Sequence, residues 1–68
     1  MTEAEEQALR TKLAELALEH RDLDSAIAAM VETGSADQLQ LGRLKKRKLQ
    51  LKDMISHIEN ALLPDIIA

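Results

Sequence analysis

Apolar residues recur along this chain at alternating steps of three and four, before and after a short turn-forming segment. Such spacing places side chains on one face of a helix and therefore predicts two amphipathic helices. The first ladder is Leu9, Leu13, Leu16, His20, Leu23, Ile27 and Met30. The second ladder is Leu41, Leu44, Lys48, Leu51, Ile55, Ile58 and Leu62. Each face is aliphatic except for one polar residue, a histidine in the first and a lysine in the second.

Residues that commonly cap helices bracket the first ladder. Thr2 and Glu5 have the spacing of a capping box, in which each side chain bonds the other residue's backbone N–H. Gly34 can adopt the left-handed conformation that ends a helix. We therefore expect a helix over residues 3–32 and a turn over residues 33–36.

The second helix has two candidate starts and one clear stop. Ser35 and Asp37 both fit as N-terminal caps, and we expect the helix over residues 37–62. Pro64 cannot continue a helix, because it lacks a backbone N–H. The apolar tail, residues 63–68, has no core of its own in the pattern.

A turn this short forces the two helices to lie antiparallel, which predicts an all-α fold: one coiled-coil-like helical-hairpin domain over residues 1–68. The paired layers are then Met30/Leu41, Ile27/Leu44, Leu23/Lys48, His20/Leu51, Leu16/Ile55, Leu13/Ile58 and Leu9/Leu62. Flanking positions bring together the opposite charges Arg10/Glu59, Asp24/Lys45 and Glu19/Arg47. Exposed pairs of this kind contribute little stability and mainly set register.

A two-helix hairpin of 68 residues is near the lower size limit for folding alone. It also carries apolar residues outside the paired faces, namely Leu18, Leu39, Leu49 and Met54, together with Ala14, Ala17, Ala28 and Ala29. These residues favour a second packing surface. We therefore expect a homo-oligomer, either a dimer that forms a four-helix bundle or a larger assembly.

Composition narrows the function further. The chain has no aromatic residue and no cysteine, so it lacks a platform for stacking bases and cannot form disulfides. Its net charge of −3 argues weakly against non-specific binding to nucleic acid. No apolar run approaches the roughly 20 residues that cross a bilayer. These features, with an acidic start that does not resemble a secretory leader, predict a cytoplasmic protein without a membrane span.

Six of the nine basic residues lie between residues 43 and 52. This run can serve as a phosphate-binding patch, or it can complement the acidic first helix, where it faces Glu19, Asp22 and Asp24. We favour the interpretation that the run complements the acidic first helix over the interpretation that it binds nucleic acid or another acidic partner. The candidate partner contacts are Arg43, Lys45, Lys46, Arg47 and Lys52, of which Arg43 and Lys46 point outward.

The two polar ladder residues, His20 and Lys48, fall in adjacent layers and are flanked by Glu19 and Asp24. We interpret this polar belt as a device that fixes register, as one buried polar residue does in coiled coils. The alternatives are a pH-sensitive interface or a metal site at His20. A metal site needs three or four ligands, and the other histidine, His57, cannot be one of them because it lies on the outer face of the second helix. We expect no catalytic site and no cofactor, because the chain lacks a nucleophile–base set and a phosphate-binding loop.

Two segments of the chain resemble the YdcH-like family of small bacterial proteins. They are Glu19-His20-Arg21-Asp22-Leu23-Asp24 with Ile27, and Asp37-Gln38-Leu39-Gln40-Leu41 followed by Arg43-Leu44-Lys45-Lys46-Arg47-Lys48-Leu49-Gln50-Leu51-Lys52-Asp53-Met54-Ile55. The resemblance covers roughly residues 15–60. It implies a short helical hairpin in the bacterial cytoplasm. It supplies no established enzyme activity, cofactor or partner.

Overall fold

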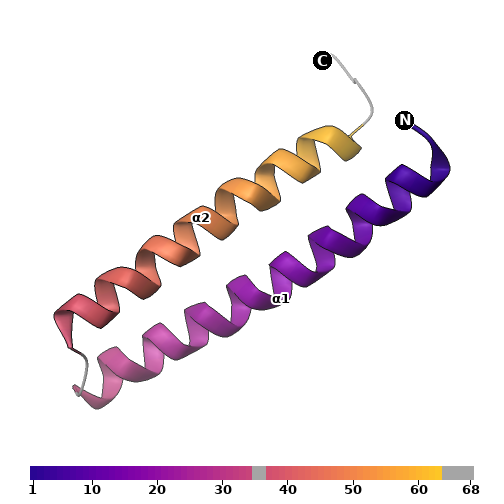
Figure 1. Cartoon of the computed structure of the whole chain (residues 1–68). Coiled ribbons are helices and arrows are strands. Elements are labelled where there is room, and N and C mark those ends of the chain that lie inside the picture. Colours follow the sequence, from indigo (N-terminus) through magenta and orange to yellow (C-terminus); the bar gives the residue numbers. More distant parts are fainter. Residues whose placement is uncertain (35–36, 64–68) are drawn as a thin grey trace.

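The computed structural model describes residues 1–34 and 37–63, which form two long antiparallel helices. Helix α1 spans Glu3–Thr33 and helix α2 spans Gln38–Leu62. The helices lie side by side along most of their length, with the start of α1 and the end of α2 at the same end of the molecule (Figure 1). The described residues contain no strand. The predicted all-α hairpin is therefore confirmed.

The ends of α1 follow from its capping residues. The Thr2 hydroxyl accepts a hydrogen bond from the Glu5 backbone N–H at 3.1 Å, and the Glu5 carboxylate accepts one from the Thr2 N–H at 3.3 Å. This confirms the predicted capping box. At the other end Gly34 is left-handed, with φ 69°, and its N–H donates to the Val31 carbonyl at 3.2 Å. The helix runs one residue past the predicted end, to Thr33.

Helix α2 begins after Asp37, whose carboxylate accepts a hydrogen bond from the Leu39 N–H at 3.0 Å. This selects Asp37 from the two predicted caps; Ser35 lies outside the described residues. At the far end the Leu63 N–H donates to the Glu59 carbonyl at 2.9 Å. The predicted stop at Pro64 and the rest of the apolar tail also lie outside the described residues.

The two glycines predict opposite effects for the same substitution. We expect Gly34→Ala to lower the free energy of unfolding by about 1–2 kcal/mol, because a Cβ is strained at φ 69°. Gly42→Ala serves as the control: it lies inside α2 with open space where a Cβ would project, so we expect a gain of about 0.5–1 kcal/mol. Urea unfolding of both variants measures the difference. A loss at both positions, or a gain at both, would contradict this account of the turn.

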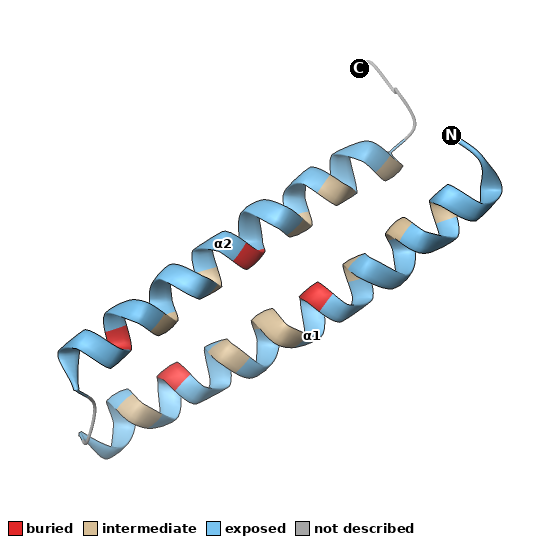
Figure 2. Cartoon of the chain, in the orientation of Figure 1, coloured by how far each residue is buried: buried red, intermediate tan, exposed pale blue. Residues whose placement is uncertain are grey.

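The buried core of the hairpin is thin. Leu16, Ile27, Leu41 and Leu51 are the buried residues among those described, at 3%, 7%, 7% and 0% exposure. They lie on the facing sides of the two helices (Figure 2). The other ten residues of the two ladders, including His20 and Lys48, are only partly shielded. The ladder pattern thus identified the seam between the helices, and it also shows that one hairpin leaves this seam partly open.

Outside the seam, large apolar side chains lie in solvent. The predicted off-seam set is exposed, with Leu18, Leu39, Leu49 and Met54 at 58%, 64%, 62% and 39%. Val31 and Leu63 add 56% and 63%. The four alanines at positions 14, 17, 28 and 29 are exposed as well. Neither helix has the length and apolarity required for a membrane-spanning segment, as judged over residues 1–34 and 37–63.

Candidate functional site

Two ion pairs join the helices near the middle of the seam. The Arg47 guanidinium donates to the Glu19 carboxylate at 3.0 Å, and the Lys48 ammonium donates to the Asp24 carboxylate at 2.7 Å. The first pair was predicted from the hairpin register. Of the two acids predicted to flank the polar belt, Glu19 and Asp24, Lys48 binds Asp24. Glu19 directly precedes the ladder residue His20, whereas Asp24 directly follows the ladder residue Leu23, so the two pairs lie on opposite sides of the seam.

The other two predicted pairs are replaced by different ones. Arg10 pairs with Glu6, one turn away in its own helix at 2.9 Å, and not with Glu59. A local partner four residues away requires less ordering of side chains than one across the seam. Asp24 pairs with Lys48 in place of Lys45. The ammonium of Lys48 reaches the edge of the seam while its stem lines the interior.

The ammonium of Lys48 changes the acidity of Asp24. The hydrogen bond and the positive charge of Lys48 hold the pKa of the Asp24 carboxyl below its ordinary value of 3.8, with a smaller contribution from His20. A depressed folded-state pKa stabilises the fold at pH values above the unfolded pKa. That stabilisation is lost as the pH falls through the folded pKa.

We therefore expect Asp24→Asn to lower stability near neutral pH and to have no such effect in strong acid. Wild-type protein should lose more stability than the variant as pH falls from about 7 to about 3, since only the wild type has this carboxylate to protonate. Urea unfolding at the two pH values measures the difference. Asp22→Asn is the matched control, because Asp22 has no ion pair in the described part of the chain. Equal acid sensitivity in wild type and Asp24→Asn would refute the pairing.

His20 occupies the seam beside this pair. Its Nε2 atom is shielded from solvent and has no hydrogen-bond partner among the described residues. The ring borders a hollow of about 580 Å³ whose other lining residues are Asp24, Lys48, Leu49, Lys52, Ile55, Ser56 and Glu59. The predicted belt residues His20, Lys48 and Asp24 are thus together, whereas Glu19 lies on the other side of the seam. A buried ring nitrogen without a partner destabilises the fold.

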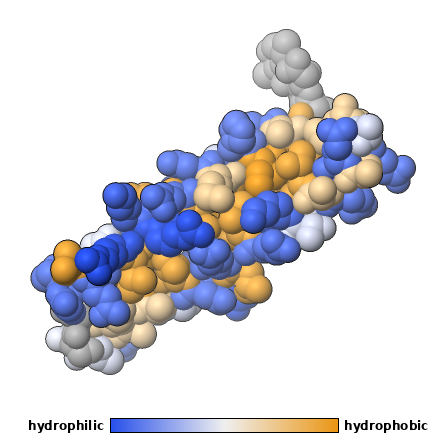
Figure 3. Space-filling model, in the orientation of Figure 1, coloured by the Kyte–Doolittle hydropathy of each residue, from blue (hydrophilic) through white to orange (hydrophobic). Residues whose placement is uncertain are grey.

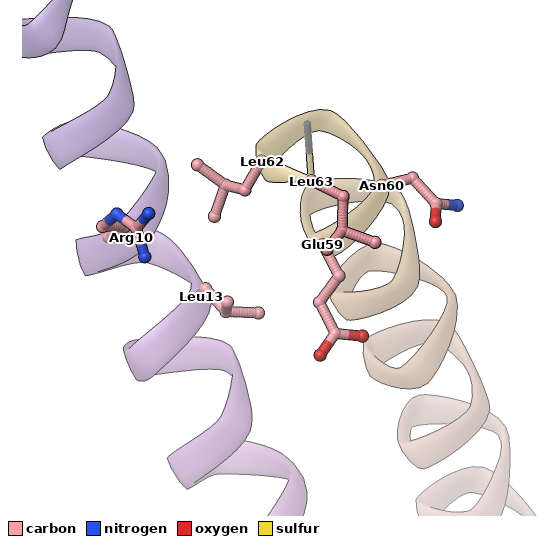
Figure 4. Close-up of a pocket in the computed structure, with 6 residues that line it drawn as sticks. All are labelled: Arg10, Leu13, Glu59, Asn60, Leu62 and Leu63. Atoms are coloured by element: carbon pink, nitrogen blue, oxygen red, sulfur yellow. The ribbon is translucent and has the colours of Figure 1, made fainter. Parts of the chain in front are cut away.

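The His20 hollow is one of several that follow the same side of the seam. A second is lined by Ile27, Lys45, Lys48 and Leu49. A third, at the turn, is lined by Met30, Val31, Gly34, Gln38 and Leu41. A fourth, at the open end, is lined by Arg10, Leu13, Glu59, Asn60, Leu62 and Leu63 (Figure 4). We call this side the Leu49 face and define it by its exposed residues Arg10, Asp24, Val31, Lys45, Leu49, Lys52, Glu59 and Leu63.

The opposite side of the seam, the Met54 face, carries Lys12, Glu19, Arg47, Met54 and His57. A hollow on this face is lined by Lys12, Leu16, Asp53, Met54, His57 and Ile58. His57 is exposed, as predicted, but it borders this hollow and does not point directly away from the hairpin. A space-filling view shows hydrophobic side chains along the junction of the helices, interrupted by hydrophilic ones (Figure 3).

The basic run of α2 is only partly neutralised. Arg47 and Lys48 have acidic partners on α1. Arg43, Lys45, Lys46 and Lys52 are exposed and make no ion pair within residues 1–34 and 37–63. The sequence pattern correctly placed Glu19 and Asp24 opposite this run, whereas Asp22 makes no ion pair within the described residues. It did not show that most of the basic residues make no ion pair within the described part of the hairpin and so can contact a partner.

No group of three or more acidic or histidine side chains in the described ranges is arranged to hold a metal ion. The hollow at His20 brings one imidazole together with two carboxylates and two ammonium groups, on residues 24, 48, 52 and 59. Sequence reasoning missed the contribution of Glu59 and Ser56 to this hollow. Both stand on the α2 turns that follow Lys48 on the same side, so heptad positions could have identified them.

The two ion pairs that join the helices, and His20, fall within a region shared with other proteins. Residues 13–59 match a family model described as a protein of unknown function (DUF465). The chain belongs to the DUF465 family. YdcH is also a DUF465 member, so the resemblance drawn from the polar belt and the basic run is confirmed. No curated protein and no solved structure matches the chain significantly. The DUF465 region covers the polar belt and most of the seam, but not the Leu9/Leu62 layer or the capping box of α1.

Proposed function

We propose that this DUF465 chain is a non-enzymatic protein–protein interaction module that self-associates and offers a charged helical surface to a further macromolecule. The observation that carries the proposal is the open seam: ten of its fourteen side chains remain partly exposed in a single hairpin. Burying apolar surface contributes roughly 25 cal/mol per Å², so a second layer over this seam stabilises the fold. We infer a bacterial cytoplasmic setting from the family resemblance.

Measurement of mass in solution tests self-association. Sedimentation equilibrium from low to high micromolar concentration should give a mass above that of one 7.6 kDa chain. Thermal stability should rise with protein concentration, because association stabilises only the folded state. A strict monomer at high micromolar concentration would overturn the proposal.

The alternative function is that of a nucleic-acid-associated accessory factor. It is favoured by the four exposed basic residues of α2 that lack an acidic partner among the described residues, Arg43, Lys45, Lys46 and Lys52. Binding to phosphates would weaken steeply between about 50 and 200 mM salt, since counterions are released.

A fluorescence anisotropy titration with short DNA and RNA duplexes tests this alternative. Binding should be lost in the double variant Arg43→Glu/Lys46→Glu. The double variant Lys12→Glu/Arg21→Glu makes the same change in net charge on α1 and is the matched control. Absence of binding at low salt, or equal loss in both double variants, would exclude a specific basic surface on α2.

A further inference from the structure

The Leu49 face combines the features expected of a surface that another helix layer covers. Its hollows are found from the turn to the open end of the hairpin, and seam residues such as Ile27 and Ile55 line them. Val31, Leu49 and Leu63 stand beside these hollows with more than half of their surface in solvent. The hollow of the Met54 face is lined in part by apolar residues, but Met54, at 39%, is the one exposed large apolar side chain among the residues that define that face. Apolar exposure is therefore concentrated on the Leu49 face.

We propose that the Leu49 face packs against the same face of a second copy of this chain, with α1 of each hairpin lying on α2 of the other. This inference rests on the proposed self-association and specifies its surface and geometry. The twofold axis runs parallel to the hairpin's length, so both turns lie at the same end of the resulting four-helix bundle.

Net charge selects this arrangement from the two that a twofold axis allows. Helix α1 carries eight acidic and three basic residues, whereas α2 has six basic residues against Asp53 and Glu59. A twofold axis across the hairpin would place α1 on α1 and α2 on α2, which brings like charges together. An axis along the hairpin places each acidic helix on a basic one, and complementary charge favours that geometry.

Individual charges on the Leu49 face agree with the same arrangement. An axis along the hairpin keeps every residue at its own height. Lys45 therefore meets Asp24 of the second copy, which lies near the same height because Asp24 contacts Lys48 one turn away. Lys48 binds only the Oδ1 atom of Asp24, and no other described residue donates to that carboxylate. Glu59 and Arg10 line one hollow, so Glu59 likewise meets Arg10 of the second copy.

The area required is available on this face. A stable interface buries about 800 Å² on each partner. That is about one seventh of the 5444 Å² accessible surface of the hairpin. One long side of a two-helix rod exceeds this fraction. The two pairs that the hairpin register predicts but does not form within one chain, Asp24/Lys45 and Arg10/Glu59, would form between chains.

Sedimentation equilibrium of charge-insertion variants tests the face. Leu49→Glu places a carboxylate at the centre of the proposed interface, and we expect its dissociation constant to rise about tenfold or more while its helical circular dichroism is retained. Leu39→Glu is the matched control, because Leu39 is equally exposed at 64% but lies away from both faces. Its dissociation constant should match that of the wild type.

The orientation is tested by spin labels attached to Leu39→Cys, a unique cysteine in a chain that otherwise has none. Two turns at the same end give a label-to-label distance set by the width of the bundle, whereas opposite ends would add a separation close to the length of α2, which is 25 residues at about 1.5 Å each. A wild-type oligomer unaffected by Leu49→Glu, or the long distance, overturns this inference and leaves self-association standing. A monomeric wild type overturns both.

Discussion

Replacing Leu51 with alanine is expected to lower the free energy of unfolding by about 2–5 kcal/mol. Leu51 is the one fully buried large side chain in the described part of the hairpin, at 0% exposure. Its removal costs the transfer free energy of the lost methyl and methylene groups and leaves a cavity in the seam. A chain of 68 residues typically has only about 3–10 kcal/mol of stability, so this one substitution should remove a large fraction of it.

Urea unfolding followed by circular dichroism measures this loss at one fixed protein concentration, since association also affects stability. Leu39→Ala is the control, because it makes the same chemical change at a side chain that is 64% exposed. Its effect should stay within about 0.5 kcal/mol. If Leu51→Ala and Leu39→Ala unfold at the same denaturant concentration, the seam is not the core of the protein.

His20→Leu is expected to raise the free energy of unfolding by about 1–3 kcal/mol. The wild-type ring places a shielded Nε2 atom in the seam without a hydrogen-bond partner among the described residues. Leucine continues the aliphatic ladder and leaves no polar group unsatisfied. A gain in stability from deleting a polar side chain is the mark of a residue that serves specificity at the expense of stability.

The same variant separates the three interpretations of His20. A register device predicts that the stability gain is the same at every pH tested. A proton-responsive switch predicts that wild-type stability changes near neutral pH and that His20→Leu abolishes the change. A metal site predicts that added Zn²⁺ stabilises the wild type and not the variant. His57→Leu, at an exposed position, should change stability by less than about 0.5 kcal/mol.

The spacing of apolar residues predicted the hairpin and its seam, because heptad periodicity reports directly on which helix face is shielded. Every ladder residue from Leu9 to Leu62 is at least partly shielded, including the two polar ones. The helix caps at Thr2 and Gly34 were also predictable, since their chemistry is local. These features depend on residues close in sequence or on a single repeated pattern.

Ion pairs were less predictable, because long charged side chains have several partners in reach. Register alone gave Glu19/Arg47 correctly. It did not predict that Arg10 pairs with Glu6 in its own helix. Nor did it predict that Lys48, and not Lys45, pairs with Asp24. The hollows of the Leu49 face were missed for a different reason. They arise because the small and polar side chains beside the seam do not cover it. The periodicity of apolar residues gives no information on the size of those side chains.

The start of α1 and the end of α2 lie together, opposite the turn (Figure 1). A pulling force applied at these two ends would therefore act perpendicular to the seam and open its layers one after another, beginning with Leu9 and Leu62. The ion pairs of Glu19 and Asp24 would be loaded only after the open-end layers had separated. Such a hairpin offers little mechanical resistance, because only one layer of the seam bears the load at a time. A tether between the two ends would abolish this weakness without touching the core.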